Sequence, residues 1–459
     1  MLLDEKEIYI PNVIDHEGLL KYVSKKVNES LSPAEIPVRF VITRTDEKQY
    51  HCELGILSEN NNFPLPQIKS IFNFKKRNYE NVKQFNAILI IPTGIGADIG
   101  GHSGDGGPVA RLLAATCDNL ITHPNVVNAA DINELPENTL YVEGSVISRL
   151  LMGTIGLQKV RSNRVMMIID NHYDKFFNEA AINSVSAARA AFGLNCPVVV
   201  KMDEKILMRS MYSRSGRAVG RIEYIEKICE IIKEYRSKFD AVALSSIIEV
   251  PSHFHEDYFK DTMGEMVNPW GGVEAMLTHT ISTLFDIPSA HSPMMNSKEV
   301  LNLDVGVVDP RKAAEAVSTT YLHCILKGLH KSPRIIDIAL VNDLSGLITV
   351  SDISCLVIPD RCIGLPTLAA LEQGITVIAV KENKNRMQND LKKLQFAPGK
   401  LFLVENYWEA VGVINALKAG IVPESVRRPL SYTTVHEKKC DQDNFLTNHN
   451  LNTPFFERE

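Results

Sequence analysis

Short apolar runs alternate with amphipathic segments through the central part of the chain. Val165–Ile169 is purely apolar, for example, whereas Arg221–Tyr235 repeats apolar residues at helical spacing. Uninterrupted apolar strands are buried on both faces, which is typical of a parallel sheet covered by helices on both sides. The strands predicted in this way are Ala87–Ile91, Leu140–Val142, Val165–Ile169, Val198–Val200 and Ala241–Leu244, and the helices between them are Val146–Leu151, Phe176–Phe192 and Arg221–Tyr235.

The same pattern divides the chain into four parts, and the predicted fold class is α/β. Residues 1–84 combine a helix at Gly18–Leu31 with a hairpin of Val38–Ile42 and Tyr50–Leu54, which predicts a small α+β unit. Residues 85–330 form the main parallel-sheet domain with the glycine-rich loop. Residues 331–428 repeat the alternation of strands and helices as a second, smaller α/β domain. The polar tail, residues 429–459, is expected to wrap the surface or to be partly disordered.

Composition and charge narrow the class of protein. The 459 residues are 45% hydrophobic and 23% charged, which is ordinary for a soluble globular protein. The formal charge of −6 gives nucleic-acid binding no electrostatic support. No apolar run is long enough for a membrane span, and the N-terminus lacks the pattern of a secretory signal. The eight cysteines have no CxxC spacing, so we expect reduced thiols and a cytoplasmic protein. The expected partner is a small molecule, and the sequence is compatible with a homo-oligomer.

The most distinctive stretch is the glycine-rich loop that follows the predicted strand Ala87–Ile91. It holds seven glycines from Gly94 to Gly107, before Pro108 opens a helix. Glycines let backbone N–H groups approach an anion, and a helix N-terminus adds partial positive charge. GADIGG at residues 96–101 is not GxGxxG, and GxxxxGK[ST] is absent, so neither a dinucleotide nor a P-loop cofactor is indicated. We expect this loop to bind an anion or a carboxylate, with a purely structural role as the alternative.

Polar residues gather where the predicted strands end, which is where ligands bind in parallel α/β sheets. Residues 361–367 also lie at the start of a predicted helix, and Trp270 precedes another helix. These positions predict a composite site in a cleft between two α/β domains. The predicted ligand-binding residues are Thr93, Gly94, Gly96, Gly100, Gly101, His102, Ser103, Gly104, Asp105, Asn125, Trp270, Arg361, Gly364 and Thr367.

Acid–base residues and one thiol are the candidate catalytic groups. His123 follows a second short predicted strand, Asn119–Thr122, and Asp170, His172 and Lys201 follow other predicted strands. An imidazole titrates near neutrality. Cys362 lies just before a predicted helix start and next to an arginine, and both features would lower the pKa of its thiol. A structural role is the alternative for each histidine and for the cysteine.

One segment offers the side chains of a metal site. His253, His255 and Glu256 supply two imidazoles and a carboxylate, which are donors that bind transition metals. The HxH spacing places both histidines on one face only in a strand, and the neighbouring prolines favour a loop. A metal-dependent enzyme is therefore an alternative, and no other cofactor is indicated.

Several phrases occur together and in order along the chain: IPTGIGADIGGHSGDGGP, ITHPNVVN, LYVEG, NPWGGVEAML, VVDPRKAAEAVS and GLPTLAALEQGITVIAVKEN. With these phrases the chain resembles the family known as domain of unknown function 3326, over about residues 87–385. The resemblance implies that the phrases belong to one site, and it implies no activity and no substrate.

Together these features predict an enzyme that acts on a small anionic metabolite, such as an amino acid or a carboxylate, in an interdomain cleft. Its chemistry would be acid–base or nucleophilic, which leaves lyase, hydrolase and isomerase reactions open. The metal-dependent enzyme is one alternative, and a non-catalytic ligand-binding or scaffold protein is the other.

Overall fold

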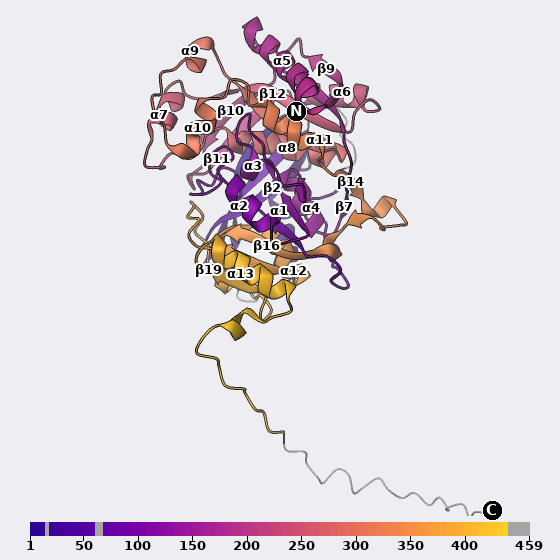
Figure 1. Ribbon diagram of the computed structural model, residues 1–459, viewed down its shortest axis with the longest axis vertical. Helices are drawn as coiled ribbons and strands as arrows, with labels where there is room; N and C mark the ends of the chain where they lie inside the picture. The colour runs from indigo at the N-terminus through magenta and orange to yellow at the C-terminus, as the bar shows by residue number, and fades with distance from the viewer. Residues whose placement is uncertain (14–17, 60–67, 439–459) are drawn as a thin grey trace, which may run out of the picture.

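The computed structural model describes residues 1–13, 18–59 and 68–438. The predicted end of the polar tail, residues 439–459, lies outside the described residues. The fold is α/β, as predicted, and its two larger sheets occupy neighbouring regions of the molecule (Figure 1). The described part of the tail from Leu430 onward is exposed and extends away from α13 (Tyr407–Lys418).

A six-stranded sheet carries the glycine-rich loop, and all of its strands are parallel. Strands β4 and β5 are buried along their whole length, as expected of strands inside a covered parallel sheet. In spatial order the strands are β19 (Leu401–Val404), β18 (Thr376–Val380), β16 (Ile353–Pro359), β4 (Asn86–Leu89), β5 (Asn119–Thr122) and β6 (Thr139–Tyr141). The helices of this region are α2 (Gly107–Ala114), α3 (Pro124–Val127), α4 (Gly144–Leu151), α12 (Leu365–Gln373) and α13.

A ten-stranded mixed sheet forms the rest of the framework. The predicted N-terminal helix and hairpin are confirmed as α1 (Leu19–Ser30) and the antiparallel pair β2 (Glu35–Thr45) and β3 (Gln49–Ser58). Strands β8 (Arg164–Ile169), β9 (Asn195–Lys201), β12 (Ala241–Glu249) and β13 (Ser289–Met294) are mutually parallel. The remaining strands are β1 (Leu2–Pro11), β10 (Leu207–Tyr212), β11 (Ala218–Glu223) and β17 (Ile363–Gly364).

Strand pairing crosses the predicted divisions at residues 84 and 330. Strand β1 pairs with β11, with Leu3 opposite Ile222, so the N-terminal hairpin continues into the sheet that holds β12. Strand β4 pairs with β16, with Leu89 opposite Val357, so the last part of the chain completes the sheet of the glycine-rich loop. Apolar runs identify strands, but they do not identify partners that lie far away in the sequence.

The helix predicted at Arg221–Tyr235 begins later than predicted. Residues Arg221–Glu223 belong to β11, and α6 (Ile225–Tyr235) begins after Tyr224, whose φ is 67°.

Strand β14 (Arg334–Asp337) pairs with β7 (Ile155–Gln158) in a small antiparallel sheet completed by β15 (Leu347–Ile348). The other helices are α5 (Lys175–Phe192), α7 (Phe254–Lys260), α8 (Gly271–Phe285), α9 (Lys298–Leu301), α10 (Ala313–Ala316) and α11 (Leu322–His330). Within the described ranges, no helix has the length and apolar character needed to cross a membrane.

Candidate active site

A cavity of about 260 Å³ lies where the two larger sheets meet. Its walls include the residues that follow β4, β5 and β6, which are the carboxyl ends of parallel strands and the usual place for a ligand in such sheets. Helix α8 lies along it, and residues of β2, β13 and β17 complete the lining. Strand β17 reaches this place because Ile363 pairs with Ile42 of β2. The cavity is therefore built from segments far apart in the sequence.

A buried carboxylate–imidazole pair forms one wall. Glu143 Oε1 lies 2.5 Å from His279 Nδ1, and the side chains are 3% and 15% exposed. Glu143 Oε2 accepts hydrogen bonds from the backbone N–H of Ser145, at 2.8 Å, and from its hydroxyl. Burial opposes a charge on Glu143, but His279 and Ser145 together hold the pKa of this carboxyl below its usual value. A carboxylate this close to Nδ1 favours a proton on that nitrogen, which leaves Nε2 as the nitrogen that can accept one.

Backbone shape brings this pair together. Glu143 caps α4, and His279 reaches it from α8. A methyl group on Gly144 would lie 3.1 Å from His279 Cε1, which is tighter than an ordinary van der Waals contact. Glycine at position 144 therefore allows the close approach of the two helices.

His123 contributes a second imidazole, but as a donor rather than the predicted base. Its Nε2 accepts a hydrogen bond from the backbone N–H of Ile91 at 3.1 Å. Burial, with the nearby His279, lowers the pKa of His123 to about 4, so the ring is neutral at pH 7. A neutral ring that accepts at Nε2 carries its proton on Nδ1. His123 can therefore donate a hydrogen bond to a ligand, while the nitrogen that could act as a base is occupied.

Two arginines supply positive charge to the cavity. Arg217 is 0% exposed and forms ion pairs with Glu53 and with Glu5, the latter at 3.4 Å. Arg39 donates to the backbone oxygens of Thr93, at 3.1 Å, and Gly272, at 3.5 Å. Among the described residues, Arg39 has no carboxylate in ion-pair contact.

Arg39 is therefore the cation of the cavity that lacks a direct partner. Burial, together with the charge of Arg217, lowers the pKa of Arg39 to about 10, so its guanidinium stays charged at pH 7. Nearby carboxylates, chiefly Glu5 and Glu53, oppose this shift without forming hydrogen bonds to Arg39. A guanidinium is well suited to bind a carboxylate through two parallel N–H groups.

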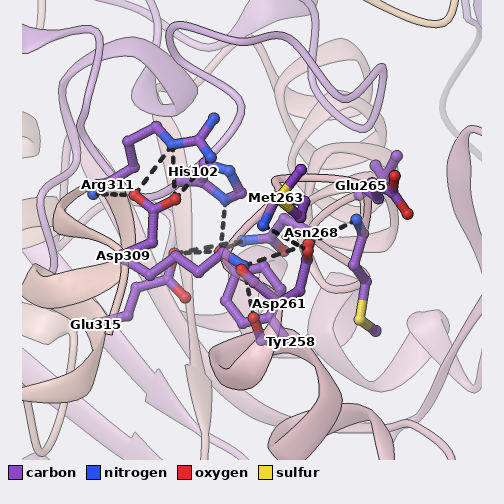
Figure 2. Close-up of polar contacts among 12 residues, drawn as sticks. His102, Tyr258, Asp261, Met263, Glu265, Asn268, Asp309, Arg311 and Glu315 are labelled. Atoms are coloured by element: carbon purple, nitrogen blue, oxygen red, sulfur yellow. Dashed lines mark hydrogen bonds and ion pairs between the residues drawn. The ribbon is translucent and has the colours of Figure 1, made fainter. Parts of the chain in front are cut away.

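A third group of side chains surrounds Glu315 of α10 (Figure 2). Its Oε1 accepts hydrogen bonds from the Ser103 N–H at 2.9 Å, the Tyr258 hydroxyl at 3.2 Å and the Asn268 amide at 3.4 Å. Burial is the main cause that raises the pKa of Glu315 to about 7. The Tyr258 hydroxyl lies 2.8 Å from His102 Nδ1, which connects the glycine-rich loop to this group.

His291 and Glu274 also line the cavity. Glu274 Oε1 lies 3.5 Å from His291 Nδ1, and His291 Nε2 lies 2.7 Å from Ser246 Oγ. The order serine, histidine and carboxylate is that of a nucleophilic triad. Ser246 does not line the cavity, however, and its hydroxyl also contacts Met208 Sδ at 2.9 Å. The arrangement therefore offers no nucleophile to a ligand in the cavity.

The glycine-rich loop binds carboxylates of its own chain, which corrects the expectation of an anion site made by its backbone. The N–H groups of Gly100 and His102 donate to Asp105 Oδ1 at 3.0 and 3.1 Å, and the N–H of Ser103 donates to Glu315. Packing requires glycine at position 104, where φ is +75° and a methyl group would lie 2.3 Å from the Ala129 backbone. The loop is thus a scaffold for the cavity wall.

Many predicted residues nevertheless lie at the cavity. Trp270 caps α8 and packs against His255, with ring centroids 4.9 Å apart. Asn125 ties the loop down by donating to the backbone oxygens of Ile91 and Gly100. The predicted residues that line the cavity are Thr93, Gly94, Gly101, His102, Ser103, His123, Asn125, His255, Trp270, Cys362, Gly364 and Thr367.

Other predicted residues lie away from it. Lys201 is exposed at the end of β9. His172 uses both ring nitrogens, because Nδ1 accepts from the Asp174 N–H and Nε2 donates to the Met295 oxygen. Asp170 accepts from the backbone N–H groups of Asn171 and Ile206, and burial raises its pKa to about 6. The predicted ligand-binding residues outside the lining are Gly96, Gly100, Gly104, Asp105 and the exposed Arg361.

The predicted activation of Cys362 is wrong. This cysteine is 4% exposed, and burial, with the charge of Asp360, raises the pKa of its thiol above the usual value. The prediction relied on the helix start and on Arg361, but Arg361 adopts φ 69° and its side chain is exposed. Desolvation and the neighbouring carboxylate therefore act in the same direction, and the thiol stays protonated at pH 7.

The predicted metal ligands are not brought together. His253 is 64% exposed at the start of α7, and Glu256 pairs with Lys260 on the surface. His255 is instead buried against Trp270. The segment is a helix, in which alternate residues point to different sides. The described ranges hold no group of three or more histidine, cysteine or acidic side chains placed to bind a metal.

Several residues of the cavity carry no signal in the sequence. Arg39 lies within a β-strand, His279 lies within a helix, and Arg217 precedes the start of β11. Each reaches the cavity only because distant segments pair. Glu143 does follow a predicted strand, so the rule that pointed to His123 could also have found it.

Comparison with known proteins places the chain among others whose role is open. It is 31% identical over 355 residues to a protein of Synechococcus sp. (strain ATCC 27144 / PCC 6301 / SAUG 1402/1) described as an uncharacterized lipoprotein, covering 76% of this chain and 96% of that one. No solved structure matches the chain. A family model described as a protein of unknown function (DUF3326) matches residues 86–427. This chain therefore belongs to the DUF3326 family.

Proposed function

We propose that this protein is an enzyme that converts a small carboxylate-bearing metabolite in the cavity by acid–base chemistry. The observation that carries the proposal is the Glu143–His279 pair, at 2.5 Å, in the wall of the same cavity that holds Arg39. The volume of about 260 Å³ is slightly below the ~300–1,000 Å³ typical of small-molecule pockets. A metabolite fits this space better than a polymer does.

In this proposal His279 moves the proton. Glu143 holds Nδ1, so Nε2 is presented as the base, and the pair also stabilises the imidazolium that forms when Nε2 takes a proton. His123 donates from Nδ1 and would stabilise negative charge that develops on the ligand. These roles fit a lyase or an isomerase that removes a proton next to a carbonyl or carboxylate group.

Arg39 would bind the carboxylate of the ligand. Its guanidinium already donates to two backbone oxygens, so its position is fixed before a ligand enters, which lowers the entropy cost of binding. A bound carboxylate would supply the direct counter-charge that the neighbouring carboxylates do not provide.

A cytoplasmic location is part of the proposal. All seven cysteines in the described part of the chain are free thiols, which suits a reducing compartment. The relative from Synechococcus is described as a lipoprotein, which makes membrane attachment the competing location. Fractionation of cells that express the full-length protein tests this point, because a membrane-bound pool released only by detergent would contradict it.

The function is tested in two steps. First, thermal unfolding is followed with a panel of hydroxy, keto and amino acids, and compounds that raise the melting temperature are kept. Second, proton NMR follows each of them for conversion by the protein. We expect Arg39→Gln to weaken binding about tenfold or more. We expect His279→Gln to keep binding and to lower the rate of conversion by about 10²–10⁴-fold.

Arg214→Gln is the control, because this substitution removes the same charge from a side chain that is 84% exposed and lies outside the cavity lining. Equal binding by wild type and Arg39→Gln would contradict the role of Arg39. Conversion by His279→Gln at the wild-type rate would contradict the acid–base role. Binding without conversion by the wild-type protein would contradict an enzyme and favour a ligand-binding protein.

A further inference from the structure

The charges that face the cavity are divided between two places. Arg39 lacks a direct carboxylate partner, as described above. The other place holds Glu315 and Glu274, which both line the cavity. Glu315 is 7% exposed, and its Oε1 takes all three of its hydrogen bonds, while Oε2 has no partner among the described residues.

The two glutamates have too little positive charge around them. The charge of Glu274 is one of the causes, after burial, that raise the pKa of Glu315, and both side chains line the cavity. Glu274 has His291 as its ion-pair partner, at 3.5 Å, and no described side chain donates a hydrogen bond to it. His102 is uncharged at pH 7, because burial lowers its pKa to about 4.

The nearest lysine does not fill this gap. Lys312 donates to the backbone oxygens of Tyr258 and Asp261, each at 2.6 Å, and lies 3.5 Å from the Asp261 carboxylate. Its ammonium is therefore committed to these oxygens, over the Tyr258 ring, and Lys312 does not line the cavity. A cation that enters the cavity would be the natural partner of Glu274 and the free oxygen of Glu315.

One short segment connects the two places. Asn268 donates to Glu315 Oε1, and Gly272, four residues later at the start of α8, accepts from Arg39. The five residues from Asn268 to Gly272 therefore contact both places, and Arg39, Glu274 and Glu315 line the same cavity of about 260 Å³. A molecule the size of an amino acid can therefore face the arginine and the glutamates at the same time.

We propose that the ligand of the cavity is a zwitterion, in which Arg39 binds a carboxylate while Glu274 and Glu315 bind a protonated amine. This inference rests on the proposed function and names its substrate class as amino acids or close relatives with a free amino group. The ammonium has three N–H donors, which match the free oxygen of Glu315 and the carboxylate of Glu274. A dicarboxylate would instead place a second negative charge beside both glutamates, which is unfavourable in a cavity of low dielectric constant.

The test uses matched sets of three compounds: an L-amino acid, the 2-hydroxy acid with the same side chain, and the amine that lacks the carboxylate. Binding to the full chain is measured by isothermal titration calorimetry. We expect the amino acid to bind about tenfold or more tightly than the hydroxy acid. Glu315→Gln and Glu274→Gln should each reduce this preference. Because both variants are measured, a folding defect in one of them does not decide the result.

Glu265→Gln is the matched control, because Glu265 is exposed in the segment before α8 and does not line the cavity. It should keep the wild-type preference. Hydroxy acids that bind as tightly as amino acids, with Arg39→Gln still weakening both, would overturn the zwitterion and leave the proposed function intact. Amines that bind as tightly as amino acids would overturn both proposals, as would the failure of every acid and amino acid to bind.

Discussion

Glu315→Gln should change how the stability of the ligand-free protein depends on pH. Glutamine keeps an oxygen that can accept from Ser103, Tyr258 and Asn268, but it cannot ionise. Burial raises the pKa of Glu315 from the ordinary value of 4.5 to about 7 in the folded protein. Below pH 4.5 the carboxyl is protonated in both the folded and the unfolded chain, so its titration contributes no difference in stability.

As the pH rises from 4.5 to 7, the unfolded chain loses this proton first, and the wild-type folded state loses stability relative to the unfolded chain. The difference between the two pKa values corresponds to about 3 kcal/mol. The free energy of unfolding of Glu315→Gln, relative to wild type, should therefore rise by about 3 kcal/mol across this range and level off above pH 7. Asp105 and Asp170, whose pKa values burial raises to about 6, are present in both proteins, so their own titrations contribute to both curves.

Urea unfolding at a series of pH values from 4 to 9 measures this difference. Glu265→Gln should follow the wild-type curve at every pH, because its side chain is exposed. A constant difference between Glu315→Gln and wild type would refute the raised pKa. A variant that becomes relatively less stable as the pH rises would show that Glu315 is charged and stabilising instead.

Three further predictions concern other parts of the site. Gly144→Ala places a methyl group 3.1 Å from His279 Cε1. It should lower the rate of conversion in the NMR assay about tenfold, while a ligand still binds. Gly107→Ala is the control and should keep the wild-type rate, because a methyl group there meets no atom within 4 Å. Arg217→Met leaves two buried carboxylates without their partner and should lower the free energy of unfolding by about 3–5 kcal/mol; a loss below about 1 kcal/mol in urea unfolding would contradict a buried network. Cys362, buried and with a raised pKa, should resist a thiol reagent at pH 7 until urea unfolds the chain, and labelling of its peptide in the native protein, detected by mass spectrometry, would contradict this.

The sequence predicts the elements of this fold well, because local physics determines them. Apolar runs such as Val165–Ile169 mark buried strands, and the helical spacing in residues 176–192 marks α5. The glycine-rich loop and the residues after β5 were expected at the site because ligands bind at the carboxyl ends of parallel strands. Thr93, His123 and Asn125 confirm this expectation of position.

What the sequence does not predict is pairing over long distances and the roles that follow from it. Arg39 is a charged residue in a strand of the N-terminal hairpin, and nothing in its neighbours indicates that β17 and α8 will close a cavity around it. His279 is hidden in a helix for the same reason. The glycine-rich loop shows the converse error, since its amides were expected to bind a ligand but bind Asp105 and Glu315. Only the assembled fold shows which donors are already in use.

The most direct test of the proposed roles of Arg39 and His279 is a crystal structure of the protein with the tightest-binding carboxylate compound from the thermal-unfolding panel. We expect the compound to lie in the cavity, with its carboxylate within hydrogen-bond distance of the Arg39 guanidinium and a carbon atom facing His279 Nε2. A ligand bound elsewhere, or one in the cavity whose carboxylate avoids Arg39, would contradict it.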